Sequence, residues 1–238
     1  DEESARAAVL DGQSIYVGGL PGTGKSHTVM SWIRQLGRKV YLTAPTHVAA
    51  RNLRVEGLEP MTLQRFWNRY LKQGSGLHAE CTVVIDEVSQ VSTQMWHRLA
   101  PLTKLTQVIC MGNPEDQLLA VADGWLDQPL AKDVSDSLLL RSICGYRRLR
   151  LTEGRRSCGE LFSIYSSFST QGWRSTIGLP YMISYARARL PPRGYADVNL
   201  VISHKARRKH IDGWIAARQP EAETLTIGSD GNTHQIRI

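Results

Sequence analysis

The sequence GGLPGTGKS at residues 18–26 is the segment that most clearly indicates the fold of the first part of this chain. Its last eight residues, Gly19 to Ser26, match the phosphate-binding pattern GxxxxGK[ST], in which small residues let backbone N–H groups face a polyphosphate. Lys25 can reach the β- and γ-phosphate oxygens, and the Ser26 hydroxyl can ligate Mg²⁺. The apolar run SIYVGG precedes the pattern and SHTVMSWIRQL follows it. This order predicts a buried strand, a loop and a helix whose N-terminus faces the phosphates of a nucleotide.

Composition indicates a folded chain. With 238 residues, 42% of them apolar, it can hold one large or two modest domains. No apolar stretch reaches the roughly 18 residues that cross a bilayer. The acidic start DEES is unlike a signal peptide, so we expect an intracellular protein (cytoplasmic, nuclear or at a viral replication site) with no membrane partner. Four scattered cysteines without a CxxC pair favour buried reduced thiols over a zinc site or disulfides.

Charge is unevenly distributed along the chain. Residues 1–140 carry 13 Lys and Arg against 15 Asp and Glu, whereas residues 141–238 carry 16 against 7. A basic half beside a near-neutral nucleotide half suggests a polyanionic partner, most simply nucleic acid. A solvated basic face would explain the same numbers, and charge alone does not separate the two interpretations.

Strand-like and helix-like segments alternate after the phosphate loop. The strand-like runs are KVYLTA (39–44), CTVVIDE (81–87) and QVICMG (107–112). The helix-like stretches are THVAARNL (46–53), MTLQRFWNRYLKQG (61–74) and STQMWHRLAPLTKL (92–105), the last interrupted near Pro101. This alternation predicts an α/β fold with a parallel sheet, right-handed crossovers and ligand sites at the carboxyl ends of the strands.

A mixed connector at residues 119–140 holds the candidate domain boundary, and we expect domains at 1–125 and 126–238. The second region reads as another α/β unit that stops early. Its expected strands are RLRLTE (148–153), DVNLVISH (197–204) and a last β-like segment from ETLTIG to HQIRI. Its expected helices are CGELFSIYSSFST (158–170) and KARRKHIDGWIAARQ (205–219).

Two carboxylates, Asp86 and Glu87, close the strand TVVI. At a strand end beside a phosphate loop, the first can hold Mg²⁺ and the second can accept a proton from the attacking water. A plain helix-capping turn is the structural alternative. The next strand leads into Gln117, which could contact the γ-phosphate, although a polar loop residue is the usual explanation for such a glutamine.

Five segments occur in the order of the helicase motifs of superfamily 1: GLPGTGKS, APTHVAA (44–50), VIDEVSQ (84–90), GNPEDQL (112–118) and LTEGRRS (151–157). The chain resembles that superfamily's DNA helicases, particularly the 5′-to-3′ branch that includes RecD and replicative helicases of large DNA viruses. TLQRFW (62–67) and LVISHKARRKHI (200–211) are similar to further segments of this branch. The resemblance implies a RecA-like domain with helices on both faces of its sheet, followed by a partial second RecA-like domain.

The resemblance also assigns roles in binding ATP and Mg²⁺. Asp86 and Ser26 would hold the metal, Glu87 would be the general base, and Gln117 would couple the γ-phosphate to motion. Arg156 would be the arginine finger that reaches the γ-phosphate, with Arg155 as the alternative bearer; two exposed arginines before a helix are the structural alternative. The residues implied to bind the nucleotide are Gly19, Gly22, Thr23, Gly24, Lys25, Ser26 and His27.

Single-stranded DNA, at a duplex junction, is the partner that the resemblance implies. Thr46 and His47 would contact the strand, and Phe66 and Trp67 could offer faces for base stacking. On an amphipathic helix, however, aromatic residues are as readily part of the core. The basic cluster at 205–209 could hold the phosphate backbone or be a solvated face.

The sequence departs from the helicase pattern in three places. Asn113 stands where the third motif carries Asp, with one extra residue before Gln117. No counterpart of the last two motifs is found before Ile238, and Gln13 lies too close to Lys25 to recognise adenine as the family's glutamine does. We therefore expect a C-terminally incomplete helicase. A phosphate-loop ATPase of another kind and a DNA-binding module that binds ATP without unwinding stay open as alternatives.

Overall fold

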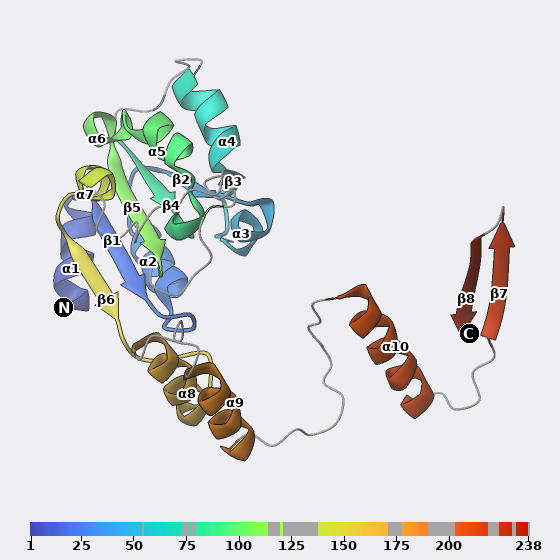
Figure 1. The fold of residues 1–238 in the computed structure, drawn as a ribbon. Coiled ribbons are helices and arrows are strands. Elements are labelled where there is room, and N and C mark those ends of the chain that lie inside the picture. Colours follow the sequence, from blue (N-terminus) through green and yellow to red (C-terminus); the bar gives the residue numbers. More distant parts are fainter. Residues whose placement is uncertain are drawn as a thin grey trace. The chain divides into compact units, whose positions relative to one another are not determined.

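A six-stranded parallel sheet organises the first part of the chain in the computed structural model (Figure 1). The strands lie in the order β3-β2-β4-β5-β1-β6, and every pairing between neighbours is parallel. Their bounds are β1 (Ile15–Gly19), β2 (Lys39–Ala44), β3 (Met61–Thr62), β4 (Cys81–Ile85), β5 (Gln107–Gly112) and β6 (Arg148–Leu151). The expected α/β class with a parallel, RecA-like sheet is thereby confirmed.

The structure describes residues 1–53, 55–72, 77, 80–113, 120, 138–170, 178–189, 203–218, 224–229 and 232–237. The chain divides into two compact units, Asp1–Gly178 and Leu179–Ile238. All six strands of the parallel sheet belong to the first unit.

Alternate residues of the central strands fill two separate cores, because successive side chains of a strand point to opposite faces of the sheet. On β1, Ile15 and Val17 enter one core, whereas Tyr16 enters the other. On β5, Ile109 and Val108 are divided in the same way. Both faces of these strands are buried, which explains why their sequences are near-continuous apolar runs.

One face of the sheet packs against the first three helices, α1 (Glu2–Leu10), α2 (Lys25–Ile33) and α3 (His47–Asn52). Helix α1 begins with a capped N-terminus: the Asp1 side chain accepts a hydrogen bond from the Ser4 backbone N–H at 2.8 Å. The sequence did not predict α1, since it contributes only a few buried residues, among them Val9.

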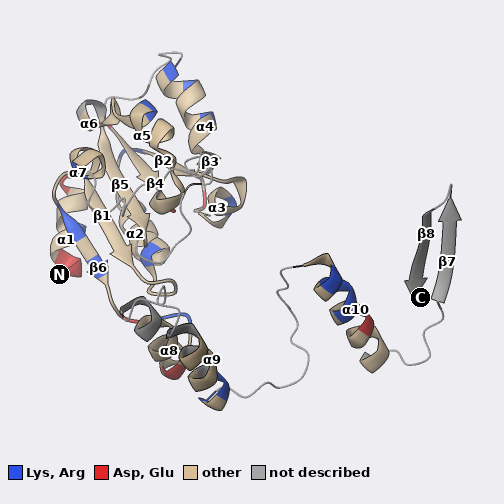
Figure 2. Cartoon of the chain, in the orientation of Figure 1, with Lys and Arg blue, Asp and Glu red and all other residues tan. Residues whose placement is uncertain are grey.

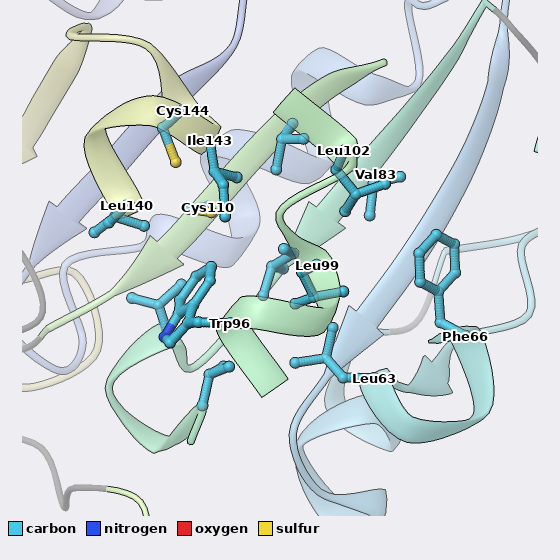
Figure 3. Packing of buried hydrophobic residues seen from close by; sticks show 14 of the residues in the cluster. Leu63, Phe66, Val83, Trp96, Leu99, Leu102, Cys110, Leu140, Ile143 and Cys144 are labelled. Carbon is cyan, nitrogen blue, oxygen red and sulfur yellow. The ribbon is translucent and has the colours of Figure 1, made fainter. Parts of the chain in front are cut away.

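The other face packs against four short helices and a π-helical turn. They are α4 (Leu63–Phe66), the π-helical turn η1 (Trp67–Lys72), α5 (Thr93–Leu99), α6 (Leu102–Leu105) and α7 (Leu138–Cys144), with the 3₁₀ turn η2 (Val88–Gln90) after β4. Figure 3 shows side chains of α5, α6 and α7, among them Trp96, Leu102 and Ile143, over strands β4 and β5. Helices therefore cover both faces, as expected.

Most of the expected elements of the first half are confirmed, with two local differences. Residues 61–62 form strand β3, which pairs with the end of β2, so the helix expected over 61–74 begins only at Leu63. The expected interruption near Pro101 is confirmed, because α5 ends at Leu99 and α6 begins at Leu102. Helix α7 begins at Leu138, inside the expected connector at 119–140, and continues to Cys144 beyond it.

Strand β6 pairs with β1, so it completes the sheet of the first unit instead of beginning a second sheet. Helix α8 (Gly159–Thr170), whose expected range is confirmed, belongs to the same unit. The residues around the expected boundary at 125 and 126 lie outside the described part of the chain. The division into two RecA-like domains therefore stays a prediction.

The second unit contains α10 (His204–Arg218) and an antiparallel hairpin of β7 (Thr224–Ser229) and β8 (Asn232–Arg237). Helix α9 (Gly178–Arg189) begins at the last residue of the first unit. The expected helix and the final β-like segment are confirmed, whereas α9 was not predicted. The strand expected at 197–204 falls mostly outside the described residues, and His204 is already helical.

Three of the four cysteines, Cys81, Cys110 and Cys144, are buried, and Cys158 is exposed. The buried thiols pack in the core beneath α5, α6 and α7. None of the helices in the described part of the chain combines the length and apolarity needed to span a bilayer.

Candidate active site

The phosphate loop leaves the sheet at the carboxyl end of β1 and enters helix α2 at Lys25. Gly22 and Gly24 have φ angles of +83° and +88°, in the left-handed region where a Cβ atom is unfavourable. Gly24 is also the residue that caps α2, so the N-terminus of this helix opens directly onto the loop. The expected strand, loop and helix are confirmed, and Lys25, Ser26 and His27 form the first turn of the helix.

Lys25 folds back over the loop. Its Nζ donates hydrogen bonds to the backbone oxygens of Gly19, at 2.6 Å, and Leu20, at 3.0 Å. Burial lowers the pKa of Lys25; the charges of Asp86 and Glu87 act in the opposite direction, and that of Arg156 lowers the pKa further. The ammonium group therefore interacts electrostatically with Asp86, Glu87 and Arg156, which come from distant parts of the sequence.

Asp86 and Glu87 follow the end of β4, between the neighbouring strands β2 and β5. Asp86 is only 8% exposed, and its backbone N–H donates to the carbonyl of Thr43 at the end of β2. Its Oδ1 accepts a hydrogen bond from the backbone N–H of Glu87 at 2.8 Å. The carboxylate is thus held at the edge of the sheet where the carboxyl ends of the parallel strands meet.

Glu87 adopts a left-handed conformation, with φ +52° and ψ +47°. It is the one residue other than glycine with a positive φ in the described part of the chain. Such a conformation costs of order 1 kcal/mol or more and is concentrated at functional sites. A plain capping turn does not require it, so this backbone geometry favours the chemical role of the carboxylate pair over the capping alternative.

Burial raises the pKa of Asp86 to about 6, with a further contribution from Glu87 and opposing contributions from the Glu87 N–H and Lys25. The ionised carboxylate is therefore less favourable in the folded chain than in the unfolded one, and a divalent cation would relieve this cost. The buried carboxylate, which interacts electrostatically with Lys25 of the loop, fits a Mg²⁺ ion as its ligand.

Replacing Asp86 by asparagine is expected to stabilise the chain at pH 7 and not at pH 4. Because the folded pKa lies above the unfolded value, the wild type loses stability as pH rises from about 4 to about 6. The difference in the free energy of unfolding should reach about 2–3 kcal/mol at pH 7, at 1.36 kcal/mol per pKa unit. Urea unfolding in EDTA at the two pH values measures it, and a difference independent of pH would contradict the burial argument.

The segment LTEGRRS continues directly from β6 and lies against the phosphate loop. The backbone N–H groups of Arg155 and Arg156 both donate to the carbonyl of Gly22, at 2.8 Å and 3.2 Å. The two side chains differ. Arg155 Nη2 lies 3.7 Å from a carboxylate oxygen of Glu2 on α1, whereas the charge of Arg156 acts on Lys25. Both side chains lie against the loop, Arg155 near Gly24 and Arg156 near Gly22, but Arg156 is the one whose charge lowers the pKa of Lys25.

Gln117, expected to contact the γ-phosphate, lies outside the described residues. The strand before it, β5, ends at Gly112, and Asn113 is 3% exposed. Asn113 follows the carboxyl end of β5, which is the neighbour of β1 in the sheet. The role of Gln117 stays a prediction.

Two of the residues expected to contact DNA are exposed at the start of α3. Thr46 caps this helix, its Oγ1 accepting a hydrogen bond from the Ala49 N–H at 3.1 Å. The hydroxyl proton of Thr46 is not used by this cap and can be donated to an acceptor such as a phosphate oxygen. His47, next to it, is also exposed.

Phe66 is not available for base stacking, and that prediction is wrong. Its side chain is 0% exposed and belongs to the core cluster drawn in Figure 3. Its ring centroid lies 5.5 Å from that of Tyr41 and 5.3 Å from that of Tyr70. The helical turn places Phe66 on its inward side, whereas Trp67 is displaced by about 100° and is half-buried. Of the two aromatic residues, Phe66 is therefore the one that belongs to the core instead of a DNA-binding surface.

Two cations approach the Trp67 ring. The Arg98 guanidinium on α5 is 4.4 Å from the indole centroid, and Lys72 Nζ is 5.4 Å from it. Exposed Arg65 and Arg69 belong to the same short helical stretch, where Figure 2 shows several basic positions. Arg98 was not predicted from the sequence, because it lies 31 positions after Trp67 and nothing in the local pattern joins the two.

The basic cluster of the second unit lies on α10. Lys205, Arg207, Arg208 and Lys209 are all exposed, and Figure 2 shows basic positions along the first half of this helix. Exposure is compatible with both a phosphate-binding role and a solvated face.

A family comparison matches residues 2–153 to the AAA_30 family of AAA domains. The chain belongs to this family. The matched span contains the phosphate loop, Asp86 and Glu87, and it ends just before the two arginines. No curated protein matches the chain.

Solved structures of Pif1 helicases share the fold of the chain. A Pif1 structure described with forked double-stranded DNA is 17% identical, with a TM-score of 0.62, over 97% of this chain and 61% of that one. Pif1 from Candida albicans is 18% identical, with a TM-score of 0.59, over 95% and 57%. Pif1 from Bacteroides, bound to ADP-AlF3 and single-stranded DNA, is 16% identical, with a TM-score of 0.57, over 96% and 59%.

The AAA_30 chain spans about three fifths of the length of these Pif1 chains. The likeness agrees with the resemblance to the 5′-to-3′ branch of superfamily 1. At this identity the likeness shows a shared fold, that of a phosphate-loop domain with a parallel sheet.

Proposed function

We propose that the chain is the ATP-hydrolysing part of a DNA helicase that couples hydrolysis to movement along single-stranded DNA and to unwinding at a duplex junction. The observation that carries the proposal is the meeting of three segments at one loop. Lys25 lies on the phosphate loop, and the charges of Asp86 and Glu87 raise its pKa. The backbone N–H of Arg156 donates a hydrogen bond to the Gly22 carbonyl of the same loop. A nucleotide-binding loop alone would not require all three.

In this mechanism Lys25 binds the phosphates together with Gly19, Gly22, Thr23, Gly24 and His27. Asp86 and Ser26 would hold Mg²⁺, which would supply neutralisation of the phosphate charge. Glu87 accepts a proton from the water that attacks the γ-phosphate, and Arg156 stabilises the charge that develops on the transferred group. Gln117 reports the presence of the γ-phosphate to the rest of the domain.

On the DNA side, Thr46, His47 and Trp67 contact the single strand. In the proposed two-domain arrangement, residues after α8 contribute part of a second RecA-like domain, since β6 and α8 belong to the first unit. Closure on ATP followed by opening then moves the strand. A second candidate is a DNA-binding module that binds ATP without unwinding. It is favoured by the exposed basic residues Lys205, Arg207 and Arg208 of α10, which could bind a phosphate backbone without any hydrolysis.

The deciding experiment is the rate of ATP hydrolysis with and without oligo-dT. Stimulation by the oligonucleotide supports the helicase, and hydrolysis indifferent to DNA indicates an ATPase of another kind. Binding of DNA and ATP without hydrolysis supports the second candidate. A forked duplex with a fluorescent strand then tests unwinding directly.

Replacing Trp67 by alanine is expected to weaken binding of single-stranded DNA by about tenfold, within the range for loss of one base–aromatic stacking contact of about 1–3 kcal/mol. Affinity for ATP should not change. Fluorescence anisotropy of labelled oligo-dT measures the effect. Tyr146→Ala is the matched control, because Tyr146 is 81% exposed in the turn before β6, at the amino end of the parallel strands, whereas the phosphate loop follows the carboxyl end of β1. Equal losses of affinity for oligo-dT in the two variants would show that Trp67 does not contact the DNA.

A further inference from the structure

Tyr165 connects helix α8 to the phosphate loop. Its Oη donates a hydrogen bond to the carbonyl of Pro21 at 3.0 Å, and Ser157 Oγ lies 3.1 Å from the same Oη. A phenol carries one proton, and here that proton goes to Pro21, so the Ser157 hydroxyl is the donor in the second bond. Ser157 thus donates to Tyr165, and Tyr165 donates to the Pro21 carbonyl of the loop.

The next carbonyl of the loop is held by the same part of the chain. Gly22 accepts the backbone N–H groups of Arg155 and Arg156. Two consecutive loop carbonyls are therefore bonded from one short segment. In a trans peptide the C=O and N–H groups point in opposite directions, so holding the Pro21 carbonyl sets the direction of the Gly22 N–H. That N–H is one of the donors with which a phosphate loop cradles its ligand.

Packing fixes the position of the Tyr165 ring independently of its hydroxyl. Phe162, one turn earlier on α8, contacts the ring edge-to-face, with centroids 5.1 Å apart and an interplanar angle of 81°. The Phe162 ring in turn lies against Gly154, where a Cβ atom would overlap it. Removing the Tyr165 hydroxyl alone therefore leaves the aromatic packing of α8 on segment 154–157 in place.

We infer that Tyr165 is a positioning residue for the proposed ATP hydrolysis. By joining Ser157 to Pro21, it holds the segment that carries Arg156 against the phosphate loop, so that the guanidinium keeps its place relative to Lys25. Nothing in the motif pattern assigns a role to Tyr165 or Ser157. The inference rests on the proposed function, because it acts through the proposed arginine finger.

The test compares Tyr165→Phe and Ser157→Ala with the wild-type chain. Tyr165→Phe loses both of these hydrogen bonds, and Ser157→Ala loses the one that Ser157 donates to Tyr165. We expect kcat to fall about fivefold to tenfold in each variant. ATP affinity, measured by calorimetry, should change less than about threefold, because the Gly22 N–H is one of several donors. The double variant should be no slower than the slower single variant, since both changes disrupt the same pair of hydrogen bonds. Tyr146→Phe removes an exposed phenol elsewhere and should leave kcat unchanged.

Single-turnover hydrolysis in the Arg156→Ala background separates positioning from general destabilisation. With the guanidinium absent, Tyr165→Phe should cost little further rate, whereas a merely structural role would lower the rate equally in both backgrounds. A wild-type chain that hydrolyses ATP while Tyr165→Phe stays within twofold of it overturns the inference and leaves the proposed function intact. A wild-type chain that does not hydrolyse ATP overturns both.

Discussion

Replacing Arg156 by alanine is expected to lower kcat for ATP hydrolysis about 10³-fold, at the lower end of the effect of an arginine finger. Arg155→Ala, the adjacent and chemically identical change, should lower kcat less than about tenfold. Both variants keep the backbone hydrogen bonds to Gly22, since these use N–H groups and not side chains. What differs is the guanidinium: that of Arg155 pairs with Glu2, and that of Arg156 acts on Lys25.

Steady-state hydrolysis at saturating ATP and Mg²⁺, with oligo-dT present, measures the two rates. Arg156→Lys keeps the charge but loses the planar fork of donors, so we expect it to recover only a small part of the loss. A larger loss in Arg155→Ala than in Arg156→Ala would reverse the assignment. Equal small losses would show that neither side chain reaches the phosphates in the reacting complex.

Replacing Glu87 by glutamine is expected to lower kcat by about 10²–10⁴-fold, the usual contribution of a general base. Affinity for ATP should stay within about threefold of the wild type, because the change removes a proton acceptor and not a phosphate contact. The amide is nearly isosteric with the carboxylate, and the left-handed backbone at this position is equally open to both residues. Hydrolysis assays and calorimetry with ATP separate the two effects.

Glu56→Gln provides the control for the loss of one negative charge in the same unit, since Glu56 is exposed in the turn before β3. We expect its kcat to equal that of the wild type. If Glu87→Gln hydrolysed ATP at an undiminished rate, the base would have to be sought elsewhere. If it lost ATP affinity by the same factor as kcat, its role would be in binding.

The parts of the site that depend on neighbouring residues were predictable. Gly22 and Gly24 supply left-handed backbone within a few residues of Lys25, and Asp86 and Glu87 follow an apolar strand without a gap. Such features arise from local conformational preference and from the carboxyl-end rule for parallel strands. The strands over 39–44 and 107–112 were predicted with the bounds that the structure shows, because both faces of the sheet are covered and the runs are largely apolar.

The aromatic pair at 66 and 67 shows where local reasoning stops. Amphipathic periodicity did not say which of the two adjacent rings faces the sheet, and both remained candidates for DNA contact. Packing against Tyr41 and Tyr70 buries Phe66, while Trp67 meets Arg98 from another helix. Since Arg98 approaches through the packing of α5 beside η1, no pattern within one helix could have identified it.

The amino-acid sequence was sufficient to establish a phosphate loop between a buried strand and a helix, a carboxylate pair at a strand end, and the α/β class. These follow from backbone freedom, hydrophobic periodicity and the chemistry of adjacent residues. The place of β6 beside β1, and hence the meeting of Arg155, Arg156 and Tyr165 with the loop, became known only from the folded chain. The reason is that strand neighbours in a parallel sheet are set by crossovers and packing, and β1 is paired with residues more than 130 positions later.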